Sequence, residues 1–453
     1  MVATAAVSTQ APIAKARAAA TWWGALGFAE RRARLLAWKR AIAARADELA
    51  AVISEETGKP VGDALLEIML AVEHLDWAAR NASRVLRRRR VRSGLLAADQ
   101  GAALAYRPLG VIAVIGPWNY PVYTPMGSIS SALAAGNAVV FKPSEHTRRT
   151  GRWLAEAWAS SAGTRGAPGD RGAPGDRGDP GGRVDPGEGV DPRGHGDRGD
   201  RGEAGDRGDL VLQVVTGGGA VGAALCLAGV DEVAFTGSAA TARKVMAACA
   251  QTLTPVVIEG GGKDAMIVAA DADLDAAAKA AAFGGFGNAG QTCAGVERVY
   301  VERPVHRDFV NRLSAIAAAL PTTGEDLPYG RMTVPSQVDI VRRHIDDALA
   351  RGGTAIVGGP EAVRLASRLR TGAASVNGVL GFAAVPALPF GGVGDSGFGR
   401  VHGPDGLREF SRAQSVTWQR FKAPLDLMKL GRDQAVLDRA VKLFRLRHAR
   451  GAK

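Results

Sequence analysis

Three short segments of the chain contain side chains with the chemistry of a catalyst. Cys293 lies in the run GNAGQTCAG, and a cysteine thiolate is a strong nucleophile. Glu259 precedes three glycines, which allow a ligand or another backbone to approach its carboxylate closely. Asn119, in IGPWNYP, carries an amide that could donate to a developing oxyanion. Taken singly, each residue also fits a non-catalytic role, as a buried thiol, a solvated carboxylate or a turn amide.

The segments that would position these groups alternate between apolar strands and helices. We interpret the following apolar runs as strands: YRPLGVIAVIGPWN, NAVVFKPSE, LVLQVVTGGG, DEVAFTGS, TPVVIEGGG and DAMIVA. Residues 120–135 are expected to form a helix rich in small side chains. Continuous apolar strands that alternate with helices predict a parallel sheet covered on both faces. Ligands bind at the carboxyl ends of such strands, which is where Asn119 and Glu259 lie.

Length and composition bound the class of protein. The chain has 453 residues, of which 46% are hydrophobic and 23% charged, so we expect two or three globular domains. No apolar run is long enough for an integral membrane segment, and the N-terminal residues do not read as a secretory signal. The cysteines, Cys226, Cys249 and Cys293, are too few and scattered for a disulfide framework or a metal site. We therefore predict a cytoplasmic protein without a bound metal.

Residues 166–209 form an insert of different composition. Glycine recurs at every third position, apart from Val184, Val190 and Arg193, and proline recurs at every sixth. A collagen-like triple helix needs an unbroken glycine frame and three chains, because only glycine fits at its axis. A composition without aromatic residues cannot bury a core, so we favour a disordered loop between a helix and a strand.

The net charge of +12 concentrates outside this insert. Basic residues cluster at 87–90 and in a C-terminal tail, 423–453, whose pattern is amphipathic at helical spacing. Neither cluster is interleaved with aromatic residues or contains a known reader motif, so we predict no nucleic-acid partner. A solvated face or a partner contact is the favoured interpretation, and the tail could also lie on an acidic membrane surface.

The ordered motifs IGPWNYP, FKPSE, FTGS, IEGGGK, NAGQTC and PFGGVGDSGFGR, followed by GLREF, strongly resemble the NAD(P)-dependent aldehyde dehydrogenase superfamily. The similarity runs from about Glu30 to about Lys422, excluding the insert. It implies an α/β fold with a Rossmann-like cofactor domain at 1–260 and a second α/β catalytic domain at 261–400. A small β oligomerisation element would combine 84–104 with 411–422, which makes members of this family homodimers or homotetramers.

The resemblance also implies a mechanism for oxidising a small-molecule aldehyde. Cys293 would attack the aldehyde carbon, and the Asn119 amide with the Cys293 backbone N–H would hold the resulting oxyanion. Expulsion of hydride to the nicotinamide leaves a thioester. Glu259 would then activate water to release the carboxylic acid.

The resemblance implies that residues at three strand ends contact the cofactor. They are Ile115, Trp118, Lys142, Ser144, Glu145, Gly237 and Ser238. Lys142 and Glu145 would hold the hydroxyls of the adenosine ribose, and a carboxylate there repels a 2′-phosphate, so NAD is expected and NADP is the alternative. Gly237 and Ser238 would meet the pyrophosphate at a helix N-terminus.

One departure from the family leaves alternative functions open. After Gly359 the chain runs through PEAVRLASRLR into TGAASVNGVL, and the motif Glu-Glu-x-Phe-Gly-Pro, which holds the nicotinamide ribose in the family, does not occur. We therefore expect an internal deletion near 359–361 and a shortened catalytic domain. The alternatives to a working dehydrogenase are a catalytically impaired relative that retains ester hydrolysis, and an interaction protein that assembles through the Gly-x-y insert.

Overall fold

The computed structural model describes residues 2–93, 99–161, 207–321, 327–352, 356, 381–421, 434–435, 438–439 and 441–442. Most of the insert at 166–209, the deletion expected near 359–361 and most of the tail at 423–453 lie outside these residues. The chain divides into two compact units, one of residues 1–85 and 108–411 and one of residues 86–107 and 412–453.

The first unit is built on a six-stranded sheet with the order β10-β7-β6-β3-β4-β5. Its strands are β3 (Val111–Ile115), β4 (Ala138–Lys142), β5 (Leu212–Val214), β6 (Glu232–Gly237), β7 (Val256–Gly260) and β10 (Gly397–Phe398). Strands β3 to β7 pair in parallel, and β10 pairs with β7 in the antiparallel sense. Every residue of β3 and β4 is buried, as their continuous apolar sequences predict.

The segment YRPLGVIAVIGPWN was wrongly interpreted as one strand. The structure divides it between β2 (Gln100–Pro108) and β3, because Pro108 has no N–H to donate and Gly110 turns the chain with φ 138°. The expected helix after this segment is α5, which begins at Tyr123 rather than at Tyr120.

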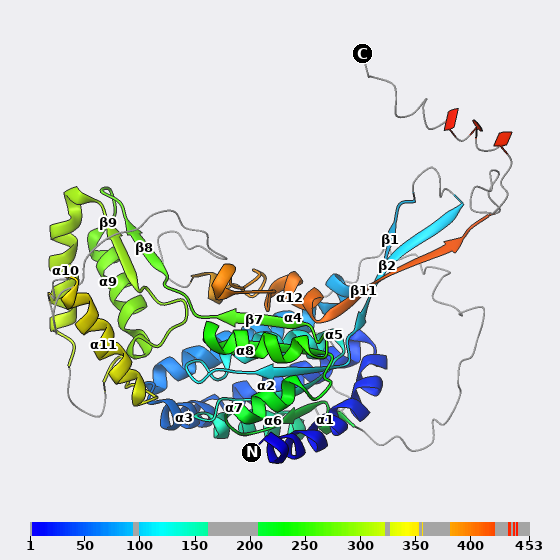
Figure 1. Cartoon of the computed structure of the whole chain (residues 1–453), viewed down its shortest axis with the longest axis horizontal. Helices are drawn as coiled ribbons and strands as arrows, with labels where there is room; N and C mark the ends of the chain where they lie inside the picture. Colours follow the sequence, from blue (N-terminus) through cyan, green and yellow to red (C-terminus); the bar gives the residue numbers. More distant parts are fainter. Residues whose placement is uncertain are drawn as a thin grey trace. The chain divides into compact units, whose positions relative to one another are not determined.

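Eight helices surround this sheet (Figure 1). They are α1 (Val2–Ala25), α2 (Phe28–Ala44), α3 (Ala46–Thr57), α4 (Val61–Leu86), α5 (Tyr123–Ala135), α6 (Arg148–Ser161), α7 (Gly219–Cys226) and α8 (Ala239–Ala250). Three buried tryptophans join α1, α2 and α6: Trp158 meets the rings of Trp23 and Trp38 edge-on at 5.7 and 5.4 Å. Each indole N–H donates to a backbone carbonyl, so these large side chains are buried without losing a hydrogen bond.

A second group of elements follows Glu259 in the same unit. Strand β8 (Ala265–Val268) pairs in parallel with β9 (Arg298–Val301), and α9 (Leu274–Phe286) and α10 (His306–Ala318) pack on them. The core of this group is Val268, Ala278, Ala281 and Phe309. Helices α11 (Ser336–Ala350) and α12 (Gly403–Glu409) also belong to this unit. A boundary between cofactor and catalytic domains at residue 260 stays a prediction.

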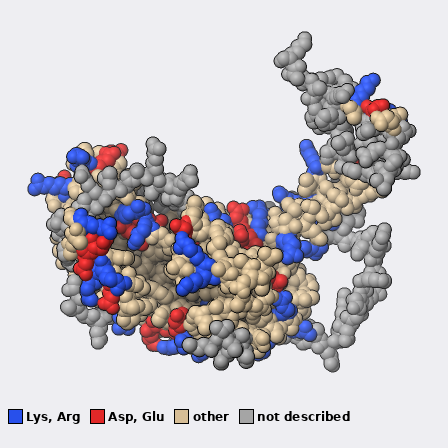
Figure 2. Space-filling view, in the orientation of Figure 1, with Lys and Arg blue, Asp and Glu red and all other residues tan. Residues whose placement is uncertain are grey.

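Charged side chains of both signs are interspersed on the face of α9–α11 shown in Figure 2. Arg312 pairs with Asp275 between α10 and α9, and Arg351 pairs with Asp347 at the end of α11 at 2.9 Å. These exposed pairs contribute little stability. On this face, Lys and Arg therefore lie beside Asp and Glu instead of forming one continuous basic patch.

The second unit contains a three-stranded sheet with the order β1-β2-β11. Strand β1 (Arg89–Val91) pairs with β2 in the antiparallel sense, and β11 spans Ser411–Gln419. The Trp418 ring lies over Gly101, where a Cβ would collide with it, and the Arg88 guanidinium stacks at 5.3 Å on the same ring. The segments 84–104 and 411–422, expected to form an oligomerisation element, contribute these strands; their role in oligomerisation stays a prediction.

Candidate active site

The three candidate catalytic residues converge from different elements of the first unit. Asn119 lies in the loop between β3 and α5, Glu259 in β7, and Cys293 in the loop between α9 and β9. The Asn119 amide donates to the backbone carbonyl of Gln291 at 2.9 Å, and the Glu259 carboxylate acts electrostatically on the Cys293 thiol. The structure therefore brings the predicted nucleophile, oxyanion donor and base to one place.

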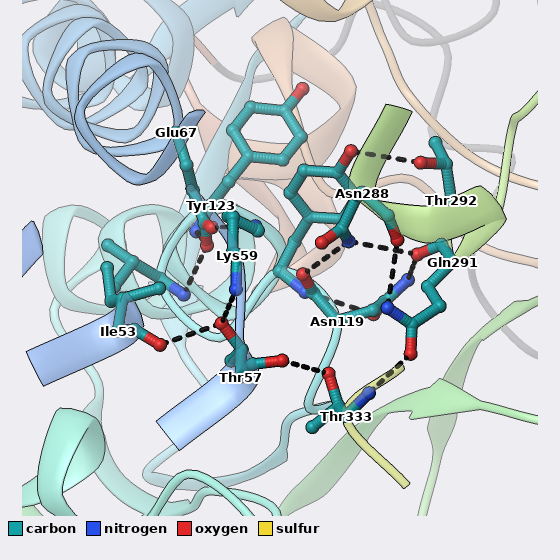
Figure 3. A network of polar contacts seen from close by, with 12 residues as sticks. Ile53, Thr57, Lys59, Glu67, Asn119, Tyr123, Asn288, Gln291, Thr292 and Thr333 are labelled. Carbon is teal, nitrogen blue, oxygen red and sulfur yellow. Dashed lines mark hydrogen bonds and ion pairs between the residues drawn. The ribbon is translucent and has the colours of Figure 1, made fainter. Parts of the chain in front are cut away.

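The loop before Cys293 has an unusual backbone. Asn288 and Ala289 have φ values of 54° and 55°, a left-handed conformation that costs a residue with a Cβ about 1 kcal/mol. The Asn288 amide holds this conformation by donating to the backbone carbonyls of Asn119 and Gln291, both at 3.2 Å (Figure 3). The Gln291 side chain donates back to the Asn288 carbonyl at 2.8 Å. Strained backbone of this kind is concentrated at functional sites.

The Cys293 thiol is half-buried and protonated at neutral pH. Burial raises its pKa to about 11, and the nearby carboxyl groups of Glu259 and Asp264 act in the same direction. The backbone N–H of Ala294 donates to the sulfur and opposes this rise in pKa. A nucleophilic thiolate at this site therefore requires a group that accepts the thiol proton.

The Glu259 carboxyl is suited to accept a proton near neutral pH. Its residue is 6% exposed, and its Oε1 has no hydrogen-bond partner among the residues that the structure describes. Burial raises the pKa of Glu259 to about 8, although Arg400 and the Gly392 N–H favour the ionised form. Gly397 of β10 lies opposite Glu259, and its φ of 117° and the close Ile258 carbonyl leave no room for a Cβ.

Two of the predicted cofactor positions lie in register on adjacent strands. Ile115, the last residue of β3, is paired with Lys142, the last residue of β4. The Lys142 ammonium is buried and donates to the Pro143 carbonyl at 3.2 Å; burial lowers its pKa, and the Glu145 charge raises it. Glu145 is exposed just beyond the end of β4, and the buried Ser144 hydroxyl donates to it at 3.5 Å.

The remaining cofactor positions lie at the next strand end. Gly237 ends β6, and Ser238 caps α8 by accepting a hydrogen bond from the Thr241 N–H at 3.2 Å. The N-terminus of this 12-residue helix is exposed at Ser238, which fits a pyrophosphate. Trp118 is half-buried in the loop after β3. The arrangement fits a dinucleotide across the ends of β3, β4 and β6.

Several residues near the thiol were not identified from the sequence. The Tyr120 hydroxyl shares a hydrogen bond with Thr292 Oγ1 at 3.0 Å, and Lys59 forms a buried ion pair with Glu67. The motifs IGPWNYP and NAGQTC contain Tyr120, Gln291 and Thr292. The sequence therefore placed these residues near the site but did not predict what each of them does. Lys59 and Glu67 lie outside the motifs, and their spacing carries no signal that both are buried.

Among the residues that the structure describes, no group of His, Cys, Asp and Glu side chains could hold a metal ion. The described helices also include none long and apolar enough to cross a membrane.

The fold and the site together define a class of α/β proteins that combine a dinucleotide-binding sheet with a reactive cysteine loop. The sequence profile of the aldehyde dehydrogenase family matches residues 2–168, 207–364 and 360–416, and the chain belongs to this family. The first interruption of the match falls in the Gly-x-y insert. The second junction, at 360–364, adjoins the position where we expected a deletion.

Individual relatives agree with this assignment. The chain is 32% identical to 4,4′-diapolycopene aldehyde oxidase of a Methylomonas species, over 92% of this chain and 82% of that protein. A solved NAD-dependent aldehyde dehydrogenase from Sinorhizobium meliloti superposes with a TM-score of 0.77 at 25% identity, over 93% of this chain and 89% of that one. An NADP-dependent enzyme from E. coli superposes with a TM-score of 0.75 at 26% identity, over 91% and 90%. The protein is thus an NAD(P)-dependent aldehyde dehydrogenase that oxidises aldehydes to acids.

Proposed function

We propose that Cys293 is the nucleophile, Asn119 the oxyanion donor and Glu259 the base in the oxidation of a neutral, apolar or aromatic aldehyde with NAD+. The observation that supports these roles most strongly is that Asn119 and Glu259, from two other elements, both act on the loop that carries Cys293. The Asn119 amide is bonded to the carbonyl two residues before Cys293, and the Glu259 charge acts on the thiol.

The proposed reaction begins with transfer of the Cys293 proton to water or to ionised Glu259. The sulfur forms a bond to the aldehyde carbon, and the carbonyl electron pair moves to oxygen, where the Asn119 amide and the Cys293 N–H stabilise it. As that pair returns, the carbon loses hydride and a thioester remains. When bound, the nicotinamide would supply the acceptor for this hydride. Glu259 first releases to solvent any proton it has taken from Cys293. In its ionised form it then removes a proton from water as the water attacks the thioester, and the C–S bond breaks to release the acid and the Cys293 thiolate.

The charges around the thiol support a substrate without a carboxylate of its own. Two neighbouring charges raise the pKa of Cys293. They belong to Glu259 and Asp264, which are both acidic. Burial raises the pKa values of Tyr120 and Tyr123, and the Cys293 charge adds to the rise. Where Glu259 is ionised, above about pH 8, these two carboxylates would repel an anionic semialdehyde, whereas an apolar aldehyde would be accepted. The similar protein from a Methylomonas species is named 4,4′-diapolycopene aldehyde oxidase.

The proposed cofactor preference is NAD over NADP. Glu145 is exposed beside Lys142, and the two charges interact. A carboxylate at this position accepts hydrogen bonds from ribose hydroxyls and repels a 2′-phosphate. Glu145→Gln should therefore raise KM for NAD+ and lower KM for NADP+, a change that initial rates with each cofactor would measure. An unchanged KM ratio would contradict the assignment of Glu145.

The proposal includes a cytoplasmic location and a homodimer or homotetramer. The three-stranded sheet of the second unit supports self-assembly because its outer strands, β1 and β11, keep an unpaired edge within the described residues. Sedimentation of the purified protein would measure the oligomeric state, and a monomer would contradict this part of the proposal.

Ester hydrolysis without a cofactor is a second candidate function. Hydrolysis of a thioester requires Cys293, Asn119 and Glu259, all of which are present. Hydride transfer additionally requires a firm hold on the nicotinamide ribose, and the sequence lacks the Glu-Glu-x-Phe-Gly-Pro motif that supplies it in the family.

The test is reduction of NAD+ at 340 nm with short aliphatic, aromatic and semialdehyde substrates, alongside hydrolysis of an activated ester. Wild-type turnover that is lost in Cys293→Ala and kept in Cys249→Ala, which changes a buried thiol of α8, supports the dehydrogenase assignment. Ester hydrolysis without aldehyde oxidation supports the second candidate. Turnover that survives Cys293→Ala would refute the nucleophile assignment.

A further inference from the structure

A buried ion pair lies behind the candidate site. Lys59 Nζ and Glu67 Oε2 are 2.5 Å apart, and both side chains are 0% exposed. Taking two charges out of water costs several kcal/mol for each ion, so a buried pair is a weak source of stability. The contacts of this pair are therefore a better guide to its role.

Glu67, on α4, holds the first turn of α5. Its Oε1 accepts hydrogen bonds from the backbone N–H groups of Val122 and Tyr123, at 2.8 and 3.1 Å. A carboxylate at a helix N-terminus satisfies donors that lack partners within the helix and interacts favourably with the helix dipole. Asn119 lies three residues before Val122, so the position of Glu67 fixes one end of the loop that carries the oxyanion donor.

Lys59 contacts the ring of Tyr120. Its Nζ lies 3.9 Å from the centroid of the Tyr120 ring, a cation–π contact that a buried ammonium makes stronger. The Tyr120 hydroxyl in turn shares a hydrogen bond with Thr292 Oγ1 at 3.0 Å. Burial raises the pKa of Tyr120 to about 12, so its hydroxyl keeps its proton at neutral pH. Thr292 immediately precedes Cys293, so the Lys59 contacts extend to the residue before the proposed nucleophile.

The backbone around Lys59 is itself tied to the cysteine loop. Gly58 ends α3 with φ 76°, and the Lys59 N–H donates to Thr57 Oγ1 at 3.2 Å. Thr333 donates through its hydroxyl to the Thr57 carbonyl at 2.6 Å and through its N–H to Gln291 Oε1 at 2.9 Å (Figure 3). The network thus returns to the residue whose carbonyl accepts from the oxyanion donor.

We propose that the Lys59–Glu67 pair is a positioning device that holds the Asn119 amide and the Cys293 thiol at their working separation. This inference rests on the roles given to Asn119 and Cys293 under the proposed function. The two charged residues act through other groups: Glu67 through the start of α5, and Lys59 through Tyr120 and Thr292.

The main test is the double variant Lys59→Met/Glu67→Gln, which removes both charges together and leaves no unpaired buried charge. We expect kcat for aldehyde oxidation and ester hydrolysis to fall about 10- to 100-fold, because small misplacements of reacting groups cost this much. KM for NAD+ should stay unchanged. The matched control is Lys39→Met/Asp76→Asn, which removes a 2.7 Å ion pair between α2 and the same helix α4 and should keep the wild-type kcat.

A second readout does not depend on turnover. The rate of Cys293 alkylation by iodoacetamide, followed by mass spectrometry across pH, reports the surroundings of the thiol. We expect the pH at the midpoint of the alkylation-rate profile to shift by about half a unit in the double variant. This shift corresponds to about a threefold change in the thiolate fraction. The control pair should leave the midpoint unchanged. If the wild type proves inactive on aldehydes and esters, the proposed function fails, and the alkylation profile still decides whether the pair positions the thiol.

Tyr120→Phe tests the same chain of contacts without touching the buried charges. It removes only the hydroxyl that bonds to Thr292, so folding should be preserved. We expect the alkylation midpoint to shift in the same direction as in the double variant, and Lys59→Arg, which keeps the charge, to shift it less than the double variant. An unchanged alkylation profile in Tyr120→Phe, or equal profiles in the double variant and its control, would overturn the proposal.

Discussion

The side-chain amide of Asn119 donates a hydrogen bond to the backbone carbonyl of Gln291, two residues before Cys293, over 2.9 Å. An amide has two N–H donors, and this bond commits one of them to the cysteine loop. The other can serve an oxyanion on the carbon attached to Cys293. One side chain therefore both locates the nucleophile loop and serves as the proposed donor to the reacting oxygen.

Replacing Asn119 with alanine should remove the oxyanion donor and the tie to Gln291 together. We expect kcat for aldehyde oxidation and for ester hydrolysis to fall about 100-fold or more, since one oxyanion donor is worth that much. KM for NAD+ should change little, because the proposed cofactor contacts lie at other strand ends. Steady-state kinetics on both substrates measures this; a loss confined to aldehyde oxidation would contradict the role.

The pH dependence of acid release should follow Glu259. Burial raises the pKa of this carboxyl to about 8, and the base is its ionised form. Thioester hydrolysis should therefore accelerate as pH rises from 7 through 8. Pre-steady-state measurement would show a burst of NADH followed by slower turnover, and the slow phase should lose its inflection near pH 8 in Glu259→Gln. An inflection that persists in Glu259→Gln belongs to another group.

Replacing alanine with glycine should change the free energy of unfolding in opposite directions in the strained loop and in a helix. Ala289 has φ 55°, so Ala289→Gly should raise the free energy of unfolding by about 1 kcal/mol. Ala280 lies inside α9, where glycine should lower the free energy of unfolding by about 1 kcal/mol. Urea denaturation of both variants gives the comparison, and destabilisation by Ala289→Gly would show that the loop relaxes in solution.

The strand ends of the main sheet were predictable because an apolar strand pattern stops there at residues with distinctive polar side chains or at glycines. Buried parallel strands read as continuous apolar runs, so β3, β4, β6 and β7 were visible, and the residues that follow them stand out as polar or glycine-rich. Strand β10 has two residues, too few for any periodic pattern. The break between β2 and β3 was missed because the apolar character continues across it while the proline and glycine change the backbone direction.

The supports of the site were less predictable than its reacting groups. Asn119 and Cys293 stand in distinctive motifs, but Lys59 and Glu67 are separated from them by a long stretch of chain. A lysine just before a helix and a glutamate in its second turn ordinarily indicate a solvated face. Their contacts are with Tyr120 and with the start of α5, and contacts between distant segments are not encoded in local sequence spacing.

A second buried carboxylate, Glu232, gives the fold an independent pH dependence. It is the first residue of β6, it is 3% exposed, and its Oε2 has no hydrogen-bond partner among the described residues. Burial, assisted by the charge of Glu409, raises the pKa of Glu232 from 4.5 to about 8. In the unfolded chain this carboxyl ionises near pH 4.5. Between pH 4.5 and 8 the unfolded state therefore loses a proton that the folded state keeps, and stability falls as pH rises through this window.

Glu232→Gln should abolish this loss of stability. At pH 4.5 the variant and the wild type should differ little, and by pH 8 the variant should be more stable by about 2–4 kcal/mol, since each pKa unit corresponds to about 1.4 kcal/mol. Urea denaturation at both pH values measures the difference. Glu259 has a similarly raised pKa, but it is present in both proteins and cancels in the comparison. Asp275→Asn, at an exposed ion pair, is the control and should show no such trend. A Glu232→Gln advantage that is equal at both pH values would instead reflect packing, because only a proton retained by the folded state makes the difference grow with pH.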